Sequence, residues 1–438
     1  MEPPEDELKT RVMAETEAAL ERLLARRKPA EEITLTEIEE LMIEASQEIK
    51  ARLTQVLVDA SVEGQTVPGP SCEVCGKEMH YKGRREKRVI TQTGEVRISR
   101  PYYYCQTCER GVFPLDERWQ LSSGAYSNGM SREMVWLSGV VPSYQQAEKV
   151  FARIGHQHVP HSSIWRRSQA HGERLKDYVE QQQAHVKPER VVIPKVDQDH
   201  NTTKGVTMDG GMVHIRNEGW KEFKAGAVFD VEIGLVRDRE TGEEVERPCA
   251  VNTNYTAVLG AVERFAPALW HLAVQADVPT AARSSVTADG AAWIWNLAAD
   301  YFPDSEQIVD WYHATEHLAE AAHALHPDDA DKATAWYKRW QEPLFEGEAW
   351  RLAQTLARAD LPDQATYFEN HKRRMRYQHF RADGFPIGSG TIESACKQFK
   401  ARLTGPGMRW SRPGAERMLV IRSAVMGDDF DALWDAPA

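Results

Sequence analysis

The sequence has no apolar run that approaches the roughly 18 residues needed to cross a bilayer. Its acidic start, MEPPEDELKT, also lacks the basic and apolar segments of a signal peptide. These absences predict a protein with no membrane partner and a cytoplasmic location. Six cysteines in 438 residues are too few for a disulfide scaffold. The length itself predicts two to four domains.

Positive charge is also scarce, since 54 Lys and Arg face 66 Asp and Glu, a net charge of −12. Net charge therefore gives no sign of nucleic-acid binding, but its distribution is uneven. Residues 1–65 hold eight Lys and Arg against 16 Asp and Glu and contain two helical patterns, over 6–27 and 35–62. Thr36 and Glu39 have the spacing of a capping box at the second helix. We interpret residues 1–65 as an acidic helical region for packing or self-association.

Four of the six cysteines form two CxxC pairs, Cys72 with Cys75 and Cys105 with Cys108. Four thiolates at this spacing can complete a tetrahedral shell, which predicts one structural Zn²⁺ and a zinc ribbon over residues 66–120. The stretch between the pairs predicts a β-hairpin around Thr93 and Gly94. Four unrelated reduced cysteines remain the alternative.

Residues 121–185 are predicted to be a helix-turn-helix region that binds DNA. One helix is expected over 144–154, then a turn at Gly155, then a second helix that opens near Pro160 and carries Arg166 and Arg167. Plain helical packing is the alternative, because many helix pairs unrelated to DNA show the same pattern.

The rest of the chain predicts a multidomain α/β protein with an antiparallel front edge to its sheet. Strands are expected at 190–193, 205–209, 212–216, 223–234, 285–289 and 306–310, and helices at 255–269, 291–301 and 314–325. The catalytic α/β domain is predicted to start in residues 186–327, to be interrupted by an all-helical, Trp-rich insertion at 328–380, and to finish in 381–438.

Three carboxylates are placed by this pattern where they could meet: Asp209 and Asp289, each expected at a strand end before glycine, and Glu393, at the start of a helix. Carboxylate oxygens are the ligands that two hard divalent cations need, and such a pair can activate water and stabilise a leaving 3′ oxygen. Asp followed by Gly is also an ordinary turn signal, and Asp197 and Asp199 compete for the first position.

The region around Glu393 is basic, with 12 Lys and Arg against three Asp and Glu over residues 371–425. On the predicted helix, Glu393, Lys397 and Lys400 lie at i, i+4 and i+7. A basic cluster in an acidic protein favours phosphate contact, so Lys397, Lys400, Arg402 and Arg409 are predicted DNA contacts.

These residues resemble those of the DDE transposases of bacterial insertion sequences, most closely the ISKra type. The resemblance covers roughly residues 70–430 and rests on Asp209-Gly-Gly-Met-Val, Ala288-Asp-Gly-Ala-Ala-Trp-Ile-Trp, Asp310-Trp-Tyr-His-Ala-Thr-Glu-His-Leu and Gly388-Ser-Gly-Thr-Ile-Glu-Ser-Ala-Cys-Lys. It implies an RNase H-like catalytic domain that cuts and joins DNA at the ends of a mobile element.

The resemblance further implies that Asp209, Asp289 and Glu393 bind two Mg²⁺ or Mn²⁺ ions, and that Asp310 and His313 belong to an element that engages DNA. The expected partners are double-stranded DNA of the element ends and the target, and further copies of the chain in a homodimer or higher oligomer. A bacterial protein that is nucleoid-associated when bound to DNA is expected.

Two other functions compete with the transposase hypothesis. A transposase-derived protein could bind DNA without catalysis, although all three carboxylates are present. Alternatively, His313, Glu316 and His317 form an HxxEH motif, the pattern of an inverted zinc metallopeptidase. The peptidase hypothesis leaves the basic region and the strand-end carboxylates unexplained.

Overall fold

The computed structural model describes residues 5–26, 28–29, 32–62, 69–121, 124–185, 202–237 and 242–436. The chain divides into two compact units, one of residues 1–134 with 149–159 and the other of residues 135–148 with 160–438. The helices α4 (Asn128–Val140) and α5 (Tyr144–Arg153) each contribute to both units. No described helix is both long and apolar enough to span a membrane.

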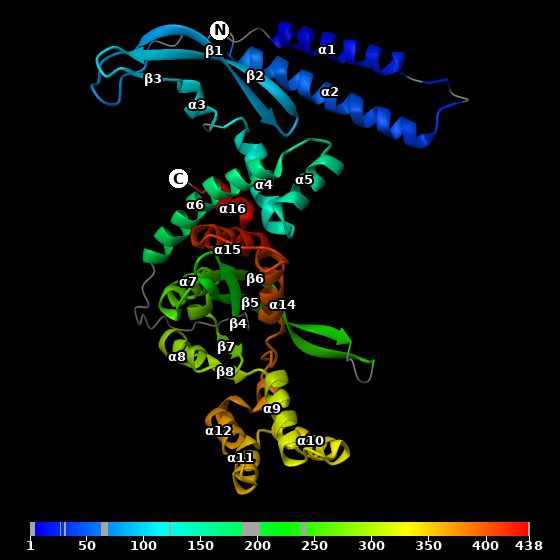
Figure 1. Ribbon diagram of the computed structural model, residues 1–438, viewed down its shortest axis with the longest axis vertical. Coiled ribbons are helices and arrows are strands. Elements are labelled where there is room, and N and C mark those ends of the chain that lie inside the picture. The colour runs from blue at the N-terminus through cyan, green and yellow to red at the C-terminus, as the bar shows by residue number, and fades with distance from the viewer. Residues whose placement is uncertain are drawn as a thin grey trace. The chain divides into compact units, whose positions relative to one another are not determined.

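The first unit joins the acidic helices to the cysteine-bearing hairpin (Figure 1). Its elements are α1 (Glu5–Ala25), α2 (Leu35–Val62), β1 (His80–Thr91), β2 (Gly94–Cys105), β3 (Arg110–Val112) and α3 (Pro114–Arg118). The hairpin predicted around Thr93 and Gly94 is confirmed, since β1 and β2 pair antiparallel up to Thr91 and Gly94. The three strands form a sheet in the order β1-β2-β3.

Helix α2 packs on this sheet through both polar and apolar contacts. Gln55 exchanges two hydrogen bonds with the backbone of Arg97, at 2.8 and 2.9 Å, and Val62 belongs to the same buried cluster as Val89 and Val96. The capping box predicted at Thr36 and Glu39 lies two residues too late, because Thr34 and Glu37 form the reciprocal pair. Helix α2 therefore shares a core with the hairpin.

The second unit is built on a five-stranded mixed sheet in the order β6-β5-β4-β7-β8. Its strands are β4 (Thr203–Ile215), β5 (Gly219–Arg237), β6 (Glu244–Leu259), β7 (Arg283–Ala288) and β8 (Glu306–Val309). The pairs β4 with β5 and β5 with β6 are antiparallel, and β4 with β7 and β7 with β8 are parallel. The α/β sheet with an antiparallel front edge is confirmed.

Two details of the predicted strands and helices are corrected. The segments 205–209 and 212–216 are one continuous strand, β4, because Gly210 and Gly211 keep their pairing with β5. The helix predicted over 255–269 starts only at Val262, since Tyr255 to Leu259 end β6, where the β-branched Thr256 and Val258 favour a strand. The strand predicted at 190–193 lies outside the described residues.

Helices follow the sheet strands much as predicted and cover both faces. They are α6 (His161–His185), α7 (Val262–Gln275), α8 (Ala292–Tyr301), α9 (Trp311–Leu325), α10 (Ala330–Phe345), α11 (Ala349–Arg358), α12 (Pro362–His371), α13 (Tyr377–Ala382), α14 (Gly390–Leu403), α15 (Arg412–Met426) and α16 (Phe430–Asp435), with short 3₁₀ turns at Val278–Thr280 and Lys372–Arg374. The stretch predicted to be an all-helical insertion is helical.

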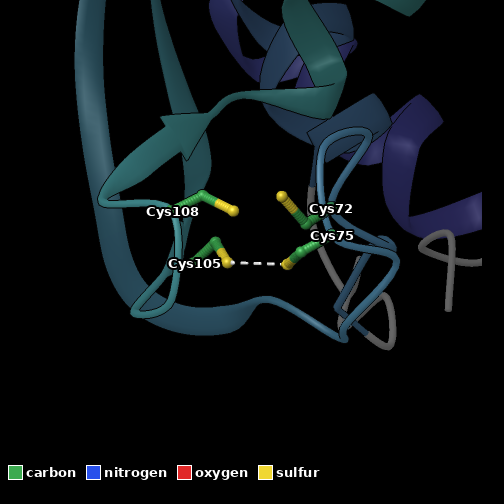
Figure 2. Close-up of side chains that lie close together, drawn as sticks. All are labelled: Cys72, Cys75, Cys105 and Cys108. Atoms are coloured by element: carbon green, nitrogen blue, oxygen red, sulfur yellow. Dashed lines mark hydrogen bonds between the residues drawn. The ribbon is translucent and has the colours of Figure 1, made fainter.

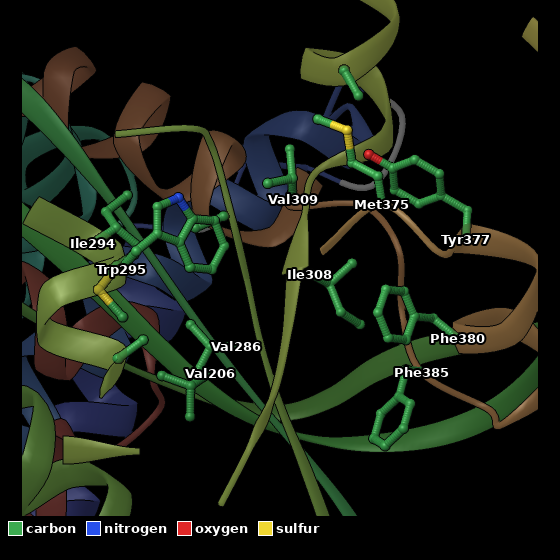
Figure 3. Packing of buried hydrophobic residues seen from close by; sticks show 14 of the residues in the cluster. Val206, Val286, Ile294, Trp295, Ile308, Val309, Met375, Tyr377, Phe380 and Phe385 are labelled. Carbon is green, nitrogen blue, oxygen red and sulfur yellow. The ribbon is translucent and has the colours of Figure 1, made fainter. Parts of the chain in front are cut away.

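The helical insertion shares a hydrophobic core with the sheet. Val206, Val286 and Ile308 of the strands lie in one buried cluster with Met375, Tyr377 and Phe380 (Figure 3). A second buried cluster on the sheet contains Val213 of β4 and Phe223 of β5 with Ile392 and Phe399 of α14. Because side chains alternate along a strand, Asp209 lies on the same side of β4 as Val213, the side that α14 covers.

Candidate metal centres

The first candidate centre is the group of four cysteines in the first unit (Figure 2). Their sulfur atoms all lie within 4.8 Å of one another, and Cys75 Sγ is 3.6 Å from Cys105 Sγ. Four sulfurs placed about 2.3 Å from a central zinc in a tetrahedron would be about 3.8 Å apart. Cys72, Cys75, Cys105 and Cys108 therefore form a group that could hold a metal ion such as zinc.

Each CxxC pair sits in a tight turn that ends with a left-handed residue. Gly76 follows the first pair with φ +70°, and its N–H donates to Cys72 O at 2.8 Å. Glu109 follows the second pair with φ 52°. This turn geometry brings both sulfurs of each pair to the same side.

The shifted pKa values of Cys72 and Cys108 also favour a cation at this site. Backbone N–H groups of Cys75 and Val74 donate to the sulfur of Cys72 and lower its pKa to about 7. The pKa of Cys108 is raised, first by its hydrogen bond with Cys75 and then by burial. Four crowded thiols cannot all ionise unless a positive ion compensates their charge, and a bound cation would supply that compensation.

The second candidate centre is a carboxylate cluster at one end of the mixed sheet, formed by Asp209, Asp289, Asp310, His313 and Glu393. The parallel pairing of β4 with β7 joins Val206 to Val286, and that of β7 with β8 joins Ala288 to Val309. Continued by a few residues, this register puts Asp209, Asp289 and Asp310 at the same level on three neighbouring strands. The three aspartates therefore arise at one end of the sheet.

The positions of the first two aspartates differ slightly from prediction. Asp209 lies within β4, paired with Ala225, and its Oδ1 accepts from Gly210 N at 2.6 Å, whereas a strand end was predicted. Asp289 does follow the end of β7, and its Oδ1 accepts from Ala291 N at 2.8 Å. Asp197 and Asp199, the rivals for the first position, lie outside the described residues.

Asp310 is the most buried residue of the cluster. It is fully buried, caps α9 by accepting from His313 N at 2.9 Å, and also accepts from Ser389 N. Ser389 Oγ in turn donates to Glu393 Oε1 at 3.3 Å. Ligand atoms of Asp310, His313 and Glu393 all lie within 4.8 Å of one another, and Asp209 and Asp289 fall outside this tightest group.

Asp209 and Asp289 interact electrostatically with this group or with each other. The pKa of Asp289 is raised, mainly by burial and then by the negative charges of Asp209 and Asp310, and His313 opposes the shift. Asp209 also forms a hydrogen bond with the thiol of Cys396, whose pKa is raised by burial and by that carboxylate. Several carboxylates that repel one another form a site where a divalent cation would relieve the repulsion.

The helical insertion supports the cluster from the other side. A Cβ at Gly290 would lie 2.6 Å from the Tyr367 ring, and His371 forms a hydrogen bond with the backbone of Gly290. Tyr367 is half-buried, and its pKa is raised by desolvation and by the charges of Asp289 and Asp310. Helix α12, which carries Tyr367 and His371, therefore helps to fix the loop of Asp289.

Sequence reasoning missed Ser389, Cys396 and Tyr367. Ser389 directly precedes α14, an ordinary helix-capping position that could have been noticed. Cys396 is buried on α14, where a cysteine can pack like a small apolar residue and carries no sequence signal of a site. Tyr367 carried no sequence signal, because only the fold brings α12 to the loop of Asp289.

The predicted DNA contacts separate into exposed and buried residues. Lys397, Lys400, Arg409 and Arg166 are exposed, and Arg167 is half-buried. Arg402 is only 2% exposed, and its guanidinium donates to Ser138 O at 2.7 Å and Pro142 O at 3.3 Å. The assignment of Arg402 as a DNA contact is corrected, because its donors bind the backbone of α4 and of the turn that follows it.

Asp310 is completely buried among other carboxylates, so its own side chain is not placed to contact DNA, and the role of the Asp310–His313 element in DNA binding stays a prediction. Much of the basic C-terminal charge is structural too. Arg412 pairs with Glu218, Arg417 pairs with Glu173, and Arg422 donates to Val140 O at 3.2 Å. The basic surface beside Glu393 is therefore narrower than the charge count suggests.

The helix pair predicted over 121–185 is present. Helix α5 ends at Arg153, α6 begins at His161, and His161 Nδ1 lies 2.7 Å from Glu148 Oε2. The exposed Trp165 and Arg166 lie in the first two turns of α6. The role of helices α5 and α6 in DNA binding stays a prediction.

The sequence profile of an uncharacterised protein family (UPF0236) matches residues 30–233. The match includes the four cysteines and Asp209, and it ends before Asp289, Asp310 and Glu393. No curated protein matches the chain.

Proposed function

We propose that the protein is a DDE-type DNA transposase that cuts and joins DNA at the ends of an insertion sequence. The proposal is supported chiefly by the carboxylate cluster, in which one aspartate within β4 and two directly after β7 and β8 lie at the end of the sheet to which α14 brings Glu393. We interpret the mixed sheet, with its helical insertion between α9 and α14, as an RNase H-like domain.

The donor set fits hard divalent cations, since carboxylate oxygens are the ligands that Mg²⁺ and Mn²⁺ prefer. Asp209, Asp289 and Glu393 would hold these ions. Asp310 would be a further ligand, because its carboxylate lies within 4.8 Å of that of Glu393. When bound, the ions would supply an activated hydroxyl and charge stabilisation for phosphodiester displacement. We propose one structural Zn²⁺ at the four cysteines, which leaves no open position for chemistry.

The protein's own residues have separate tasks in this proposal. Asp310 and Ser389 position Glu393 through two hydrogen bonds, and the Asp209 carboxylate is oriented by Gly210 N and Cys396. Lys397 and Lys400, exposed one and two turns beyond Glu393, would contact phosphates of the DNA. Because two element ends must be joined, we propose that at least two copies of the chain act together.

The proposal is tested by strand joining with the full chain and DNA that carries the element ends. Joining is expected with Mg²⁺ or Mn²⁺, and Asp209→Asn is expected to abolish it. DNA binding without joining by the unaltered protein would support the non-catalytic alternative. Hydrolysis of peptides would support the metallopeptidase alternative instead.

The geometry around His313 favours the transposase over the peptidase. His313 belongs to the group with Asp310 and Glu393, whereas the ring of His317 lies 3.8 Å from the ring of Tyr367, centroid to centroid. Glu316, the expected base of a peptidase, lies 3.3 Å from His313 Nδ1. His313 thus lies beside the carboxylates of Asp310 and Glu393, which an HxxEH zinc site does not require.

Lys397→Ala is expected to weaken DNA binding and to make its salt dependence shallower. Loss of one phosphate contact lowers the slope of log affinity against log salt by about 0.9 on duplex DNA. Binding is measured over a range of salt concentrations, with Lys338→Ala, an exposed lysine of α10, as the matched control. An unchanged slope for Lys397→Ala would remove this residue from the DNA path.

A further inference from the structure

Besides the carboxylate cluster, the second unit contains a cavity of about 340 Å³, which we name the arginine–tryptophan pocket. It is lined by Tyr144 of α5, Trp165 of α6, Arg216 after β4, and Arg409 and Trp410 between α14 and α15. Arg216 comes seven residues after Asp209 along an extended strand, a span of about 23 Å. The pocket is therefore separate from the carboxylate cluster.

The inner wall of the pocket is fixed by hydrogen bonds. Trp410 Nε1 donates to Leu403 O at 2.9 Å, and its backbone exchanges hydrogen bonds with His214 O and Arg216 N. Behind it, the buried guanidinium of Arg402 lies 4.6 Å from the ring centroid of Tyr144 and 5.0 Å from that of Trp410. This wall does not need to rearrange when a ligand enters, which lowers the cost of binding.

The rim of the pocket is aromatic and cationic. Trp165 is 49% exposed, and Arg216 and Arg409 are exposed. Arg402 adds a third positive charge, and the described residues that line the pocket include no Asp or Glu. A flat ligand can stack on the indole of Trp165 while the arginines hold an attached anion.

A nucleotide has both properties, because its base is a flat π-system and its phosphate is an anion. Bases in unpaired nucleic acid stack on aromatic side chains, and arginine contributes both phosphate contacts and cation–π contacts. Bases inside a duplex are already stacked on their neighbours and could not enter a cavity. The aromatic and cationic residues of the pocket are therefore suited to a nucleotide that is not base-paired within a duplex.

We propose that the arginine–tryptophan pocket binds an unpaired nucleotide of DNA, with the base on Trp165 and the phosphate between Arg216 and Arg409. This inference rests on the proposed function in one respect, the choice of DNA as the ligand. It adds to that function a site that grips displaced single nucleotides away from the reacting phosphate.

The test compares binding of the full chain to two duplexes of equal length, one fully paired and one with a single unpaired adenine. The unaltered protein is expected to bind the second duplex about ten-fold more tightly, within the range of one base–aromatic stack. Trp165→Ala is expected to remove this preference and to keep the affinity for the paired duplex. Trp350→Ala, which removes a 46% exposed tryptophan of α11, is the matched control and should keep the preference.

Two results would overturn the inference: equal binding of both duplexes by the unaltered protein, or an unchanged preference in Trp165→Ala. Arg409→Gln provides a second variant, expected to weaken the preference by removing the phosphate contact. If free dAMP competed as strongly as DNA with an unpaired adenine, the pocket would be a site for free nucleotides, and the inference would also be overturned. These experiments measure DNA binding and not strand joining, so their results can be interpreted even if the protein proves to have no transposase activity.

Discussion

Glu393→Gln is expected to abolish strand joining while binding to the element ends persists. The change removes one carboxylate ligand and one negative charge but keeps the size of the side chain, so the α14 helix should form as before. Because residues that merely support a metal ligand already cost 10- to 100-fold when altered, loss of a ligand should reduce the rate by more than about 100-fold.

The measurement is the rate of joining at saturating DNA, together with DNA affinity and thermal unfolding of the same preparation. Glu342→Gln, which alters an exposed carboxylate of α10, is the control and should leave the rate unchanged. Full joining activity in Glu393→Gln would remove this residue from the site. Loss of DNA binding in a folded Glu393→Gln protein would mean that the helix contributes to affinity rather than to chemistry.

Cys72→Ser is expected to remove the bound zinc and to unfold the region around the four cysteines. Zinc binding contributes on the order of 10 kcal/mol to the folding of small zinc modules, comparable with the whole stability of a typical domain. The cysteine cluster has few other buried apolar neighbours, chiefly Met79 and Tyr103. Residues 69–79 and 105–112 should therefore lose protection from hydrogen exchange first.

The β1–β2 hairpin should retain part of its protection, because α2 packs on it independently of the metal. The mixed sheet should remain as protected as before. Zinc content and hydrogen exchange are measured together, with Cys249→Ser as the control, since the Cys249 thiol donates to Arg247 O and lies outside the cluster. Stoichiometric zinc in Cys72→Ser, or unchanged protection of residues 69–79, would contradict this account.

The sequence predicted best the features that are local along the chain. The second acidic helix, the hairpin at Gly94 and the parallel strands ending at Ala288 and Val309 follow from periodicity and turn residues. The cysteine group was predictable because CxxC spacing fixes the geometry of each half of the site. Strand β6 was missed because part of its pattern also suits a helix.

Features that depend on tertiary contacts could not be predicted from periodicity. The buried position of Asp310 depends on the level of β8 beside β7 and on Ser389, 79 residues further along the chain. Arg402 appears cationic and available in the sequence, but its burial against the backbone of Ser138 is a product of folding. Charge counts along the chain cannot separate such structural arginines from exposed lysines such as Lys397.

Equilibrium binding of Mn²⁺, followed through the paramagnetic resonance signal of the free ion, tests whether the carboxylate cluster holds divalent cations. We expect the unaltered protein to bind Mn²⁺ and Asp310→Asn and Glu393→Gln each to weaken this binding at least ten-fold, with zinc content unchanged. Mn²⁺ bound as tightly by both variants as by the unaltered protein would contradict the assignment of the carboxylate cluster as the cation site.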